Sequence, residues 1–186
     1  MFHLTLLDHL RLTFGHVVYR HKAHAEIAQS RAQRSRWLRG TEALLTTGTA
    51  LAAIAAAFAK GPGYSIAAAA LATALLVVFL VHLTFDLDAS ARAHGACAAR
   101  LWHIRERYRA LLSDLSDGAV DVDAARRVRD ALMLELHAIY QDAPPADRSA
   151  YEAAGHAAAD EAALTDDEID LFLPRSLQKG GKPATT

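Results

Sequence analysis

Residues 43–85 have the sequence ALLTTGTALAAIAAAFAKGPGYSIAAAALATALLVVFLVHLTF, in which Lys60 is the only residue with a full charge. A Gly-Pro-Gly-Tyr sequence separates two apolar blocks. As a helix, the first block, residues 43–59, would be about 25 Å long, slightly shorter than the roughly 30 Å hydrocarbon core of a bilayer. The second block, residues 61–85, is long enough to cross that core. We therefore predict an all-α membrane protein with a transmembrane hairpin over residues 41–85, a short first span and long helices that extend into a cytoplasmic helical bundle.

An alternative is a soluble helical bundle that buries an Ala-rich hairpin, because alanine is a strong helix former and only mildly apolar. A soluble helix normally has a polar face, however, and neither apolar block carries a charged one. Trp37 and Tyr64 also lie near the expected water boundaries, where amphipathic aromatic rings anchor membrane spans. These features favour the membrane hairpin.

Charge and composition separate the rest of the chain from this hairpin. The 20 Lys and Arg and the 21 Asp and Glu residues lie almost wholly outside it, and the net charge of -1 gives no reason to expect nucleic acid binding. The single cysteine, Cys97, excludes an intramolecular disulfide and fits a reducing compartment. The sequence has no glycine-rich phosphate loop, no Cys and His set with metal-ligand spacing and no nucleophile motif. We therefore expect no enzymatic activity and no cofactor, metal or nucleic acid.

The distribution of basic residues predicts the orientation of the hairpin. Lys60 is the only basic residue at the turn, whereas four arginines precede the first span, namely Arg31, Arg34, Arg36 and Arg39. Because basic residues are enriched on the cytoplasmic side of membrane spans, both termini are expected in the cytoplasm. The N-terminus is a mixed amphipathic segment without the pattern of an export signal.

Residues 1–40 are predicted to form a cytoplasmic amphipathic helix. Apolar and histidine residues recur there at alternating spacings of three and four between Leu7 and Ala28, as on one helix face. His21 and His24 share this face, a spacing that suits a metal ion, but no nearby cysteine or carboxylate pair completes a ligand set. We favour a packing role for these histidines, and a pH response stays open because histidine titrates near neutrality.

Residues 86–173 are predicted to form a cytoplasmic helical region. The helix of the second span is expected to continue through Asp86 to about Asp114 and to present a second apolar stripe, which can pack on the N-terminal one. The stretch 116–118 favours a turn. A further helix is expected from Asp121 or Asp123, either of which can cap it.

The end of this region contains two more helix boundaries. That helix is expected to end near Asp142, before two prolines, because the residue before a proline avoids the helical conformation. A short helix is predicted over 147–163, and the stretch 165–168 has the pattern of a capping box that begins a final turn. The tail at 174–186, rich in Gly, Lys and Pro, is expected to be disordered.

The first span has a small side and a bulky side. Small residues on one side allow membrane helices to approach closely, so this side is a candidate helix-packing or pore-facing surface. It consists of Thr41, Gly48, Ala52 and Ala56. Packing is the favoured role, and the alternative is that threonine hydroxyls line a narrow aqueous path in an oligomer, although threonine also bonds to carbonyls of its own helix. His82 is a candidate gate or proton site, but its closeness to Asp86 favours an interfacial position.

The chain resembles the SLATT family, bacterial two-transmembrane effector domains found alongside nucleotide-generating or nucleotide-sensing proteins. The resemblance covers about Leu7 to Ala163 and rests on a basic helix before a two-span hairpin, a very short turn and a long helix after the second span. It also includes the sequence Ile-Tyr-Gln-Asp-Ala-Pro-Pro at 139–145 and a tyrosine after it. The motif residues are Tyr140, Pro144, Pro145 and Tyr151.

The resemblance implies an effector of a bacterial antiphage, abortive-infection system. Such an effector would sit in the inner membrane as a multi-pass homo-oligomer and perforate the bilayer when a partner signals infection. The resemblance further implies a separate sensor or nucleotide-generating partner, since this chain has no such domain of its own. An alternative of another class is a non-conducting, membrane-anchored scaffold whose cytoplasmic helices recruit a partner.

Overall fold

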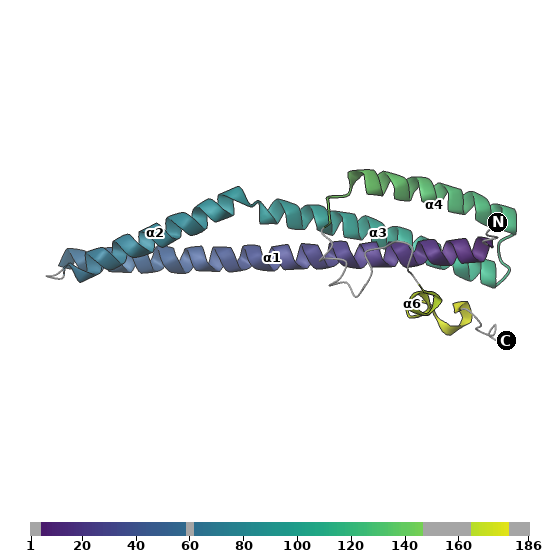
Figure 1. The fold of residues 1–186 in the computed structure, drawn as a ribbon, viewed down its shortest axis with the longest axis horizontal. Helices are drawn as coiled ribbons and strands as arrows, with labels where there is room; N and C mark the ends of the chain where they lie inside the picture. Colours follow the sequence, from purple (N-terminus) through teal and green to yellow (C-terminus); the bar gives the residue numbers. More distant parts are fainter. Residues whose placement is uncertain (1–4, 59–61, 147–164, 179–186) are drawn as a thin grey trace. The chain divides into compact units, whose positions relative to one another are not determined.

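The computed structural model describes residues 5–58, 62–146 and 165–178, and these residues contain helices and turns but no strand (Figure 1). The helices are α1 (Leu6–Phe58), α2 (Gly63–Thr84), α3 (Leu87–Ser116), α4 (Val122–Asp142), α6 (Asp166–Asp170) and the 3-10 helix η1 (Arg175–Leu177). The prediction of an all-α fold with two long apolar helices is confirmed.

The chain forms two compact units. The core unit comprises residues 1–27 and 93–186, and the hairpin unit comprises residues 28–92. Helix α1 contributes its first half to the core unit and its second half to the hairpin unit. Since no proline interrupts this stretch, α1 runs without a break into the first apolar block.

The core unit is held together by apolar side chains from α1, α3 and α4. The two stripes expected from the spacing of three and four both lie in this core, where removal of apolar surface from water is the main stabilising effect. The buried residues include Leu10, Phe14 and Val17 of α1, Leu101, Ile104, Tyr108 and Leu111 of α3, and Leu132, Leu136 and Ile139 of α4. Residue Leu7, which the sequence places on the first stripe, is exposed.

The boundaries of α4 follow from local sequence. The carboxylate of Asp121 accepts hydrogen bonds from the backbone N–H groups of Asp123 and Ala124 at 2.9 and 2.8 Å, and so caps the helix. The preceding turn contains Gly118 with a φ of 68°, a conformation that glycine adopts without strain. At the other end, Ala143 is extended because two prolines follow it.

The junction between α2 and α3 differs from the prediction of a continuous helix through Asp86. Helix α2 ends at Thr84, and Phe85 has extended torsion angles (φ −107°, ψ 95°). The carboxylate of Asp86 then accepts a hydrogen bond from the backbone N–H of Ala89 at 2.9 Å and caps α3, which begins at Leu87. Aspartate satisfies the free N–H groups at a helix start, and it therefore favours a new helix here over continuation of the old one.

The C-terminal part of the core unit is ordered further than expected. The predicted capping box is present, since Thr165 and Glu168 each accept a hydrogen bond from the other's backbone N–H. The prediction of a disordered tail from residue 174 is wrong for residues 174–178, because η1 forms there and Leu177 packs against the core. Residues 179–186 and the predicted helix over 147–163, with Tyr151, lie outside the described residues.

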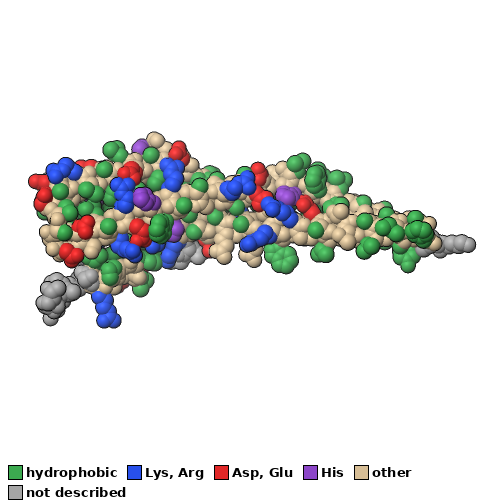
Figure 2. Space-filling model, turned by 180° about the vertical axis from the view of Figure 1, so that it is seen from behind, with side chains coloured by type: hydrophobic (Ala, Val, Ile, Leu, Met, Phe, Trp, Pro, Cys, Tyr) green, Lys and Arg blue, Asp and Glu red, His purple; other side chains and the backbone are tan. Residues whose placement is uncertain are grey.

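Two helical stretches, Leu6–Phe58 and Gly63–Ser116, contain segments long and apolar enough to cross a membrane, judged by length and composition. No residue of either most apolar segment is buried within the protein. Figure 2 shows charged side chains over the core unit and over part of the hairpin unit, whereas the described residues near the α1–α2 turn present hydrophobic groups among uncharged atoms. Helices that expose apolar residues all round are typical of a lipid environment.

Candidate functional site

The apolar helices α1 and α2 meet along one narrow face of each. The partly covered residues of α2 recur at spacings of three and four, and the other residues of this helix are exposed. They are Ala68, Leu71, Leu75, Val78 and His82. A β-carbon placed on Gly48 of α1 would lie 3.4 Å from Cδ1 of Leu71, so Gly48 faces α2 with room for a side chain no larger than that of alanine. We call this contact the hairpin interface.

The structure separates the four residues of the predicted small side of α1. Gly48, Ala52 and Ala56 lie one helical turn apart and are partly covered, which places them on the side of α1 that faces α2. Thr41 is exposed. The bulky residues of the same helix point outward, with 77% of Leu44 and 87% of Phe58 exposed. The small side therefore packs within the chain, whereas the bulky side is available to lipid.

The threonine hydroxyls of the hairpin bond within their own helices. Thr46, Thr47 and Thr49 each donate to the carbonyl oxygen four residues earlier, at 2.7, 2.8 and 2.7 Å. Thr73 of α2 does the same at 2.9 Å. This is the arrangement by which a threonine is satisfied inside a membrane helix without a partner from another helix or from water.

An ionisable pair connects α1 and α2 at the end of the hairpin remote from Gly63. Nδ1 of His82 lies 2.9 Å from Oε1 of Glu42, and both side chains are partly buried. The structure therefore places the candidate residue His82 on the hairpin interface rather than on an outer face of α2. Polar groups between apolar helices hold the helices in register, because a shift would leave both groups without a partner.

More polar contacts follow on the same side of α1. The hydroxyl of Ser35 donates to Oδ1 of Asp88 at 2.7 Å, and Arg39 pairs with the other oxygen of this carboxylate. The hydrogen bond from Ser35 and then that from Arg39 lower the pKa of Asp88, which therefore stays ionised. Arg31 donates to the hydroxyl of Ser90. We call these contacts, together with the Glu42–His82 pair, the polar junction.

The sequence contains a weak signal for the polar junction. Glu42 stands three residues before Leu45, seven before Thr49 and ten before Ala52, and thus on the same helical face as part of the small side. A carboxylate at that position favours a partner on the facing helix, and His82 is the only basic residue of α2. The sequence alone does not show which face of α2 packs against α1.

Two histidines form a buried contact in the core unit. Nδ1 of His24 on α1 lies 3.0 Å from Nδ1 of His94 on α3, and the two side chains are 3% and 1% exposed. Burial, and then the charges of His94 and Arg20, lower the pKa of His24 to about 4. A turn earlier, Nδ1 of His21 donates to the carbonyl oxygen of Ala98 at 3.0 Å. The packing role favoured for His21 and His24 agrees with this arrangement.

The histidine pair does not extend into a metal-ligand set. In residues 5–58, 62–146 and 165–178, no group of three or more His, Cys, Asp or Glu side chains is placed to hold a metal ion. Cys97 is buried, and burial raises the pKa of its thiol, so the neutral thiol is favoured over the thiolate that binds metals. The absence of a metal, a cofactor and an enzymatic activity stays a prediction.

The residues of the Ala-Pro-Pro motif lie at the end of α4. The guanidinium of Arg20 on α1 lies over the ring of Tyr140 at 4.4 Å from the ring centre, a cation–π contact that joins α1 to α4. Pro144 is half-buried and Pro145 is exposed, and both follow the extended residue Ala143 that ends the helix. Tyr151 lies outside the described residues, so its relation to Tyr140 stays a prediction.

Comparison with known proteins identifies one family. The model of the SMODS and SLOG-associating 2TM effector domain family 4 matches residues 6–168, which include the whole hairpin unit and most of the core unit. No curated protein and no solved structure matches this chain. The matched region includes both apolar helices and the four residues of the Ala-Pro-Pro motif. The chain therefore belongs to the SMODS and SLOG-associating 2TM effector domains of family 4.

Proposed function

We propose that this protein is the membrane-perforating effector of a bacterial defence system, opened by a signal from a partner protein. The family supports a defence-associated effector with two membrane spans. The observation that carries the proposal is the hairpin, whose two helices expose apolar residues on all faces except one narrow interface. Helix α2 alone, with 22 residues, would extend about 33 Å and so cross a bilayer.

The proposed topology is multi-pass, with both termini in the cytoplasm of the inner membrane. The arginines of the polar junction, Arg31 and Arg39, flank the end of the hairpin that would meet the cytoplasmic surface. The exposed ring of Trp37 lies between them in sequence, which suits the proposed topology because aromatic side chains anchor spans at the membrane surface. The core unit would then lie in the cytoplasm, where a partner can reach it.

Perforation in this proposal requires several copies of the chain. In a single hairpin the small residues are covered at the hairpin interface, and two helices alone cannot enclose a path for ions. The outward residues Leu44, Leu51 and Ile54 are free to contact lipid in one state and other copies in another. A signal that separates α1 from α2 would expose Gly48 and the Glu42–His82 pair, and these polar and small groups suit a pore lining.

Dye release from vesicles tests this function. The purified full-length chain is reconstituted into vesicles of phosphatidylethanolamine and phosphatidylglycerol that hold a fluorescent dye, and the proteins encoded beside its gene are added with nucleotide triphosphates. We expect release that rises steeply with protein density, as oligomeric pores require. Intact vesicles, with the chain shown by carbonate extraction to be membrane-inserted, would contradict perforation but not membrane insertion.

A non-conducting scaffold is the second candidate, and one observation favours it. The hydroxyls of the hairpin threonines are satisfied by their own helices, so no polar stripe is free in the closed hairpin. Replacement of residues 41–85 by an unrelated two-span hairpin distinguishes the candidates in infected cells. Loss of protection supports perforation, whereas full protection with the unrelated hairpin supports the scaffold.

A further inference from the structure

The C-terminal segment, residues 165–178, packs on the first half of α1 within the core unit. Ile169 and Leu173 are 2% and 5% exposed and belong to the buried core, and Phe172 and Leu177 pack against it. These four residues all follow residue 168, where the match to the family ends. These four residues therefore lie outside the matched region.

A buried arginine holds the segment in place. Arg11 of α1 is 4% exposed, and its guanidinium donates to Oδ1 of Asp170 at 2.5 Å and to the carbonyl oxygen of Leu177. Oδ1 of Asp166 lies 3.8 Å from the same group. The fixed fork of arginine donors suits several oxygens at once, so this one side chain connects both ends of the segment to α1.

Two more residues of α1 contact the aromatic ring of Phe172 in the segment. The rings of Tyr19 and Phe172 meet edge to face at a centroid distance of 5.8 Å, and Nζ of Lys22 lies 4.2 Å from the centre of the Phe172 ring. Burial, and then the charge of Glu168, raise the pKa of Tyr19. Together Arg11, Tyr19 and Lys22 form what we call the α1 docking surface.

The C-terminal segment and the α1 docking surface are chemically complementary. Residues 165–170 have the sequence Thr-Asp-Asp-Glu-Ile-Asp and carry four carboxylates, and the apolar sequence Leu-Phe-Leu follows them. The α1 docking surface offers two cations and an aromatic ring next to the apolar core. It therefore fits a short helical turn that is acidic on one side and apolar on the other.

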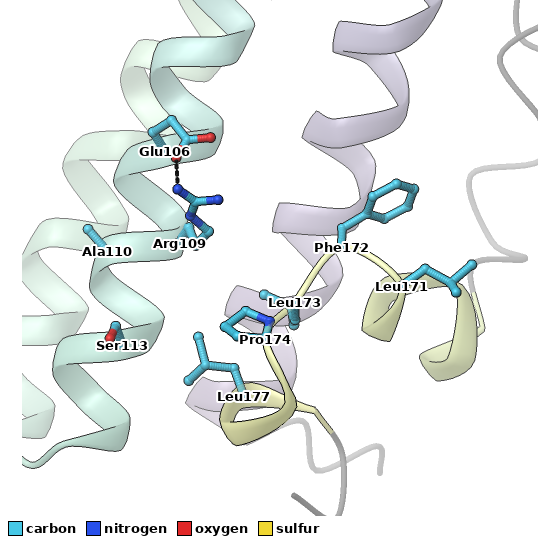
Figure 3. Close-up of a pocket in the computed structure, with 9 residues that line it drawn as sticks. All are labelled: Glu106, Arg109, Ala110, Ser113, Leu171, Phe172, Leu173, Pro174 and Leu177. Atoms are coloured by element: carbon cyan, nitrogen blue, oxygen red, sulfur yellow. Dashed lines mark ion pairs between the residues drawn. The ribbon is translucent and has the colours of Figure 1, made fainter. Parts of the chain in front are cut away.

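The same segment packs poorly against α3. A cleft of about 660 Å³ lies between them, lined on α3 by Glu106, Arg109, Ala110 and Ser113 and on the segment by Leu171, Phe172, Leu173, Pro174 and Leu177 (Figure 3). Figure 3 shows Arg109 turned along its own helix toward Glu106, with which it forms an ion pair at 2.5 Å. Because atoms that line empty space lose the contacts of close packing, the side of the segment that faces this cleft is packed less closely than the side that lies on α1.

We propose that the α1 docking surface is a binding site for acidic and apolar protein segments, occupied at rest by residues 165–178 and open to competition from a similar segment of a partner protein. The inference extends the proposed function by naming the chemistry of the activating partner. It rests on that function only for the consequence of displacement, because binding to Arg11, Tyr19 and Lys22 does not require that the hairpin conducts.

A labelled peptide with the sequence of residues 165–178 tests the site. The full-length variant Ile169→Asp/Leu173→Asp removes the apolar contacts of the resident segment and leaves α1 unchanged. Fluorescence anisotropy in detergent should show at least tenfold tighter peptide binding to this variant than to the wild-type chain. Adding Arg11→Met to the variant should abolish this increase in peptide affinity. Adding Arg109→Met instead, on the far side of the cleft, should leave the increase unchanged. Equal binding with and without Arg11, or binding to no variant, would overturn the proposal.

A second measurement needs no substitution. The backbone N–H groups of Ile169, Phe172 and Leu173 donate to carbonyls within the segment, so they exchange slowly with deuterium while it is docked. An excess of the unlabelled peptide should speed their exchange in the wild-type chain severalfold and leave α4 unchanged, and a peptide of scrambled sequence should do nothing. Unchanged exchange at saturating peptide would show that the segment is a permanent part of the core. Dye release is measured separately, so a failure of perforation is distinguishable from a failure of docking.

Discussion

The two halves of helix α1 behave differently although they form one continuous element. In the core unit its side chains are buried by α3 and α4, and Phe14 is 1% exposed. In the hairpin unit none of its apolar residues is buried, and Phe58 is 87% exposed. The first half is therefore stabilised by burial within the protein, and the second half depends on small residues, a few polar contacts and the surrounding lipid. One helix is thus suited to two solvents.

The largest effect is expected from truncating the same side chain in each half. Phe14→Ala should lower the free energy of unfolding of the core unit by about 3–5 kcal/mol, because it leaves a cavity in a packed core. Phe58→Ala, a matched control in the same helix, should have little effect on that unit. Thermal unfolding in detergent, with hydrogen exchange of α4, measures both. Equal losses would contradict the division of α1 into a buried and an exposed half.

The next effect is a pH dependence confined to the core unit. His24 has a pKa of about 4 when folded and 6.5 ordinarily, so the unfolded chain binds a proton between these values and the folded chain does not. The free energy of unfolding should fall by about 3 kcal/mol as the pH drops from 6.5 to 4, and level off below that. His24→Gln should flatten this slope, while His9 and His16, whose pKa values burial also lowers, retain part of it. A slope unaffected by the substitution would assign the effect to another group.

A smaller effect is expected at the hairpin interface. Gly48→Ala should be tolerated, because its β-carbon would make an ordinary 3.4 Å contact with Leu71, whereas Gly48→Leu should separate α1 from α2 at a cost of about 1–3 kcal/mol. Electron paramagnetic resonance distances between spin labels at Ala53 and Ala74, in a Cys97→Ser background, report this separation. An unchanged distance in Gly48→Leu would show that the helices do not approach at this glycine in the bilayer.

The smallest effect concerns the ionisable pair. Glu42→Leu should loosen the hairpin by about 1 kcal/mol because it leaves His82 without its partner, whereas Glu42→Gln retains one hydrogen bond and should be milder. Spin labels at exposed positions Leu44 and Val81 should show a broader distance distribution in the first variant. If both substitutions broaden the distance distribution equally, the charge of Glu42 rather than its hydrogen bond holds this end of the hairpin together.

The sequence by itself determined the local and periodic features of this protein. Helix α1 is continuous because no proline interrupts it, and the stripes of α1 and α3 follow from a spacing that puts residues on one face. The cap of α4 and the capping box at Thr165 depend on residues at most three apart. The helix break at Phe85 has the same local origin in the capping by Asp86, but an unbroken apolar pattern obscured it.

Only the tertiary structure decided which side chains meet. Glu42 and His82 are 40 residues apart, His24 and His94 are 70 apart, and Arg11 and Asp170 are 159 apart. These contacts depend on the rotation and register of packed helices, which the periodic pattern of a single helix does not contain. The order of residues 174–178 has the same origin, since a composition typical of a disordered tail is overridden by the contacts of Leu177 with α1 and the core.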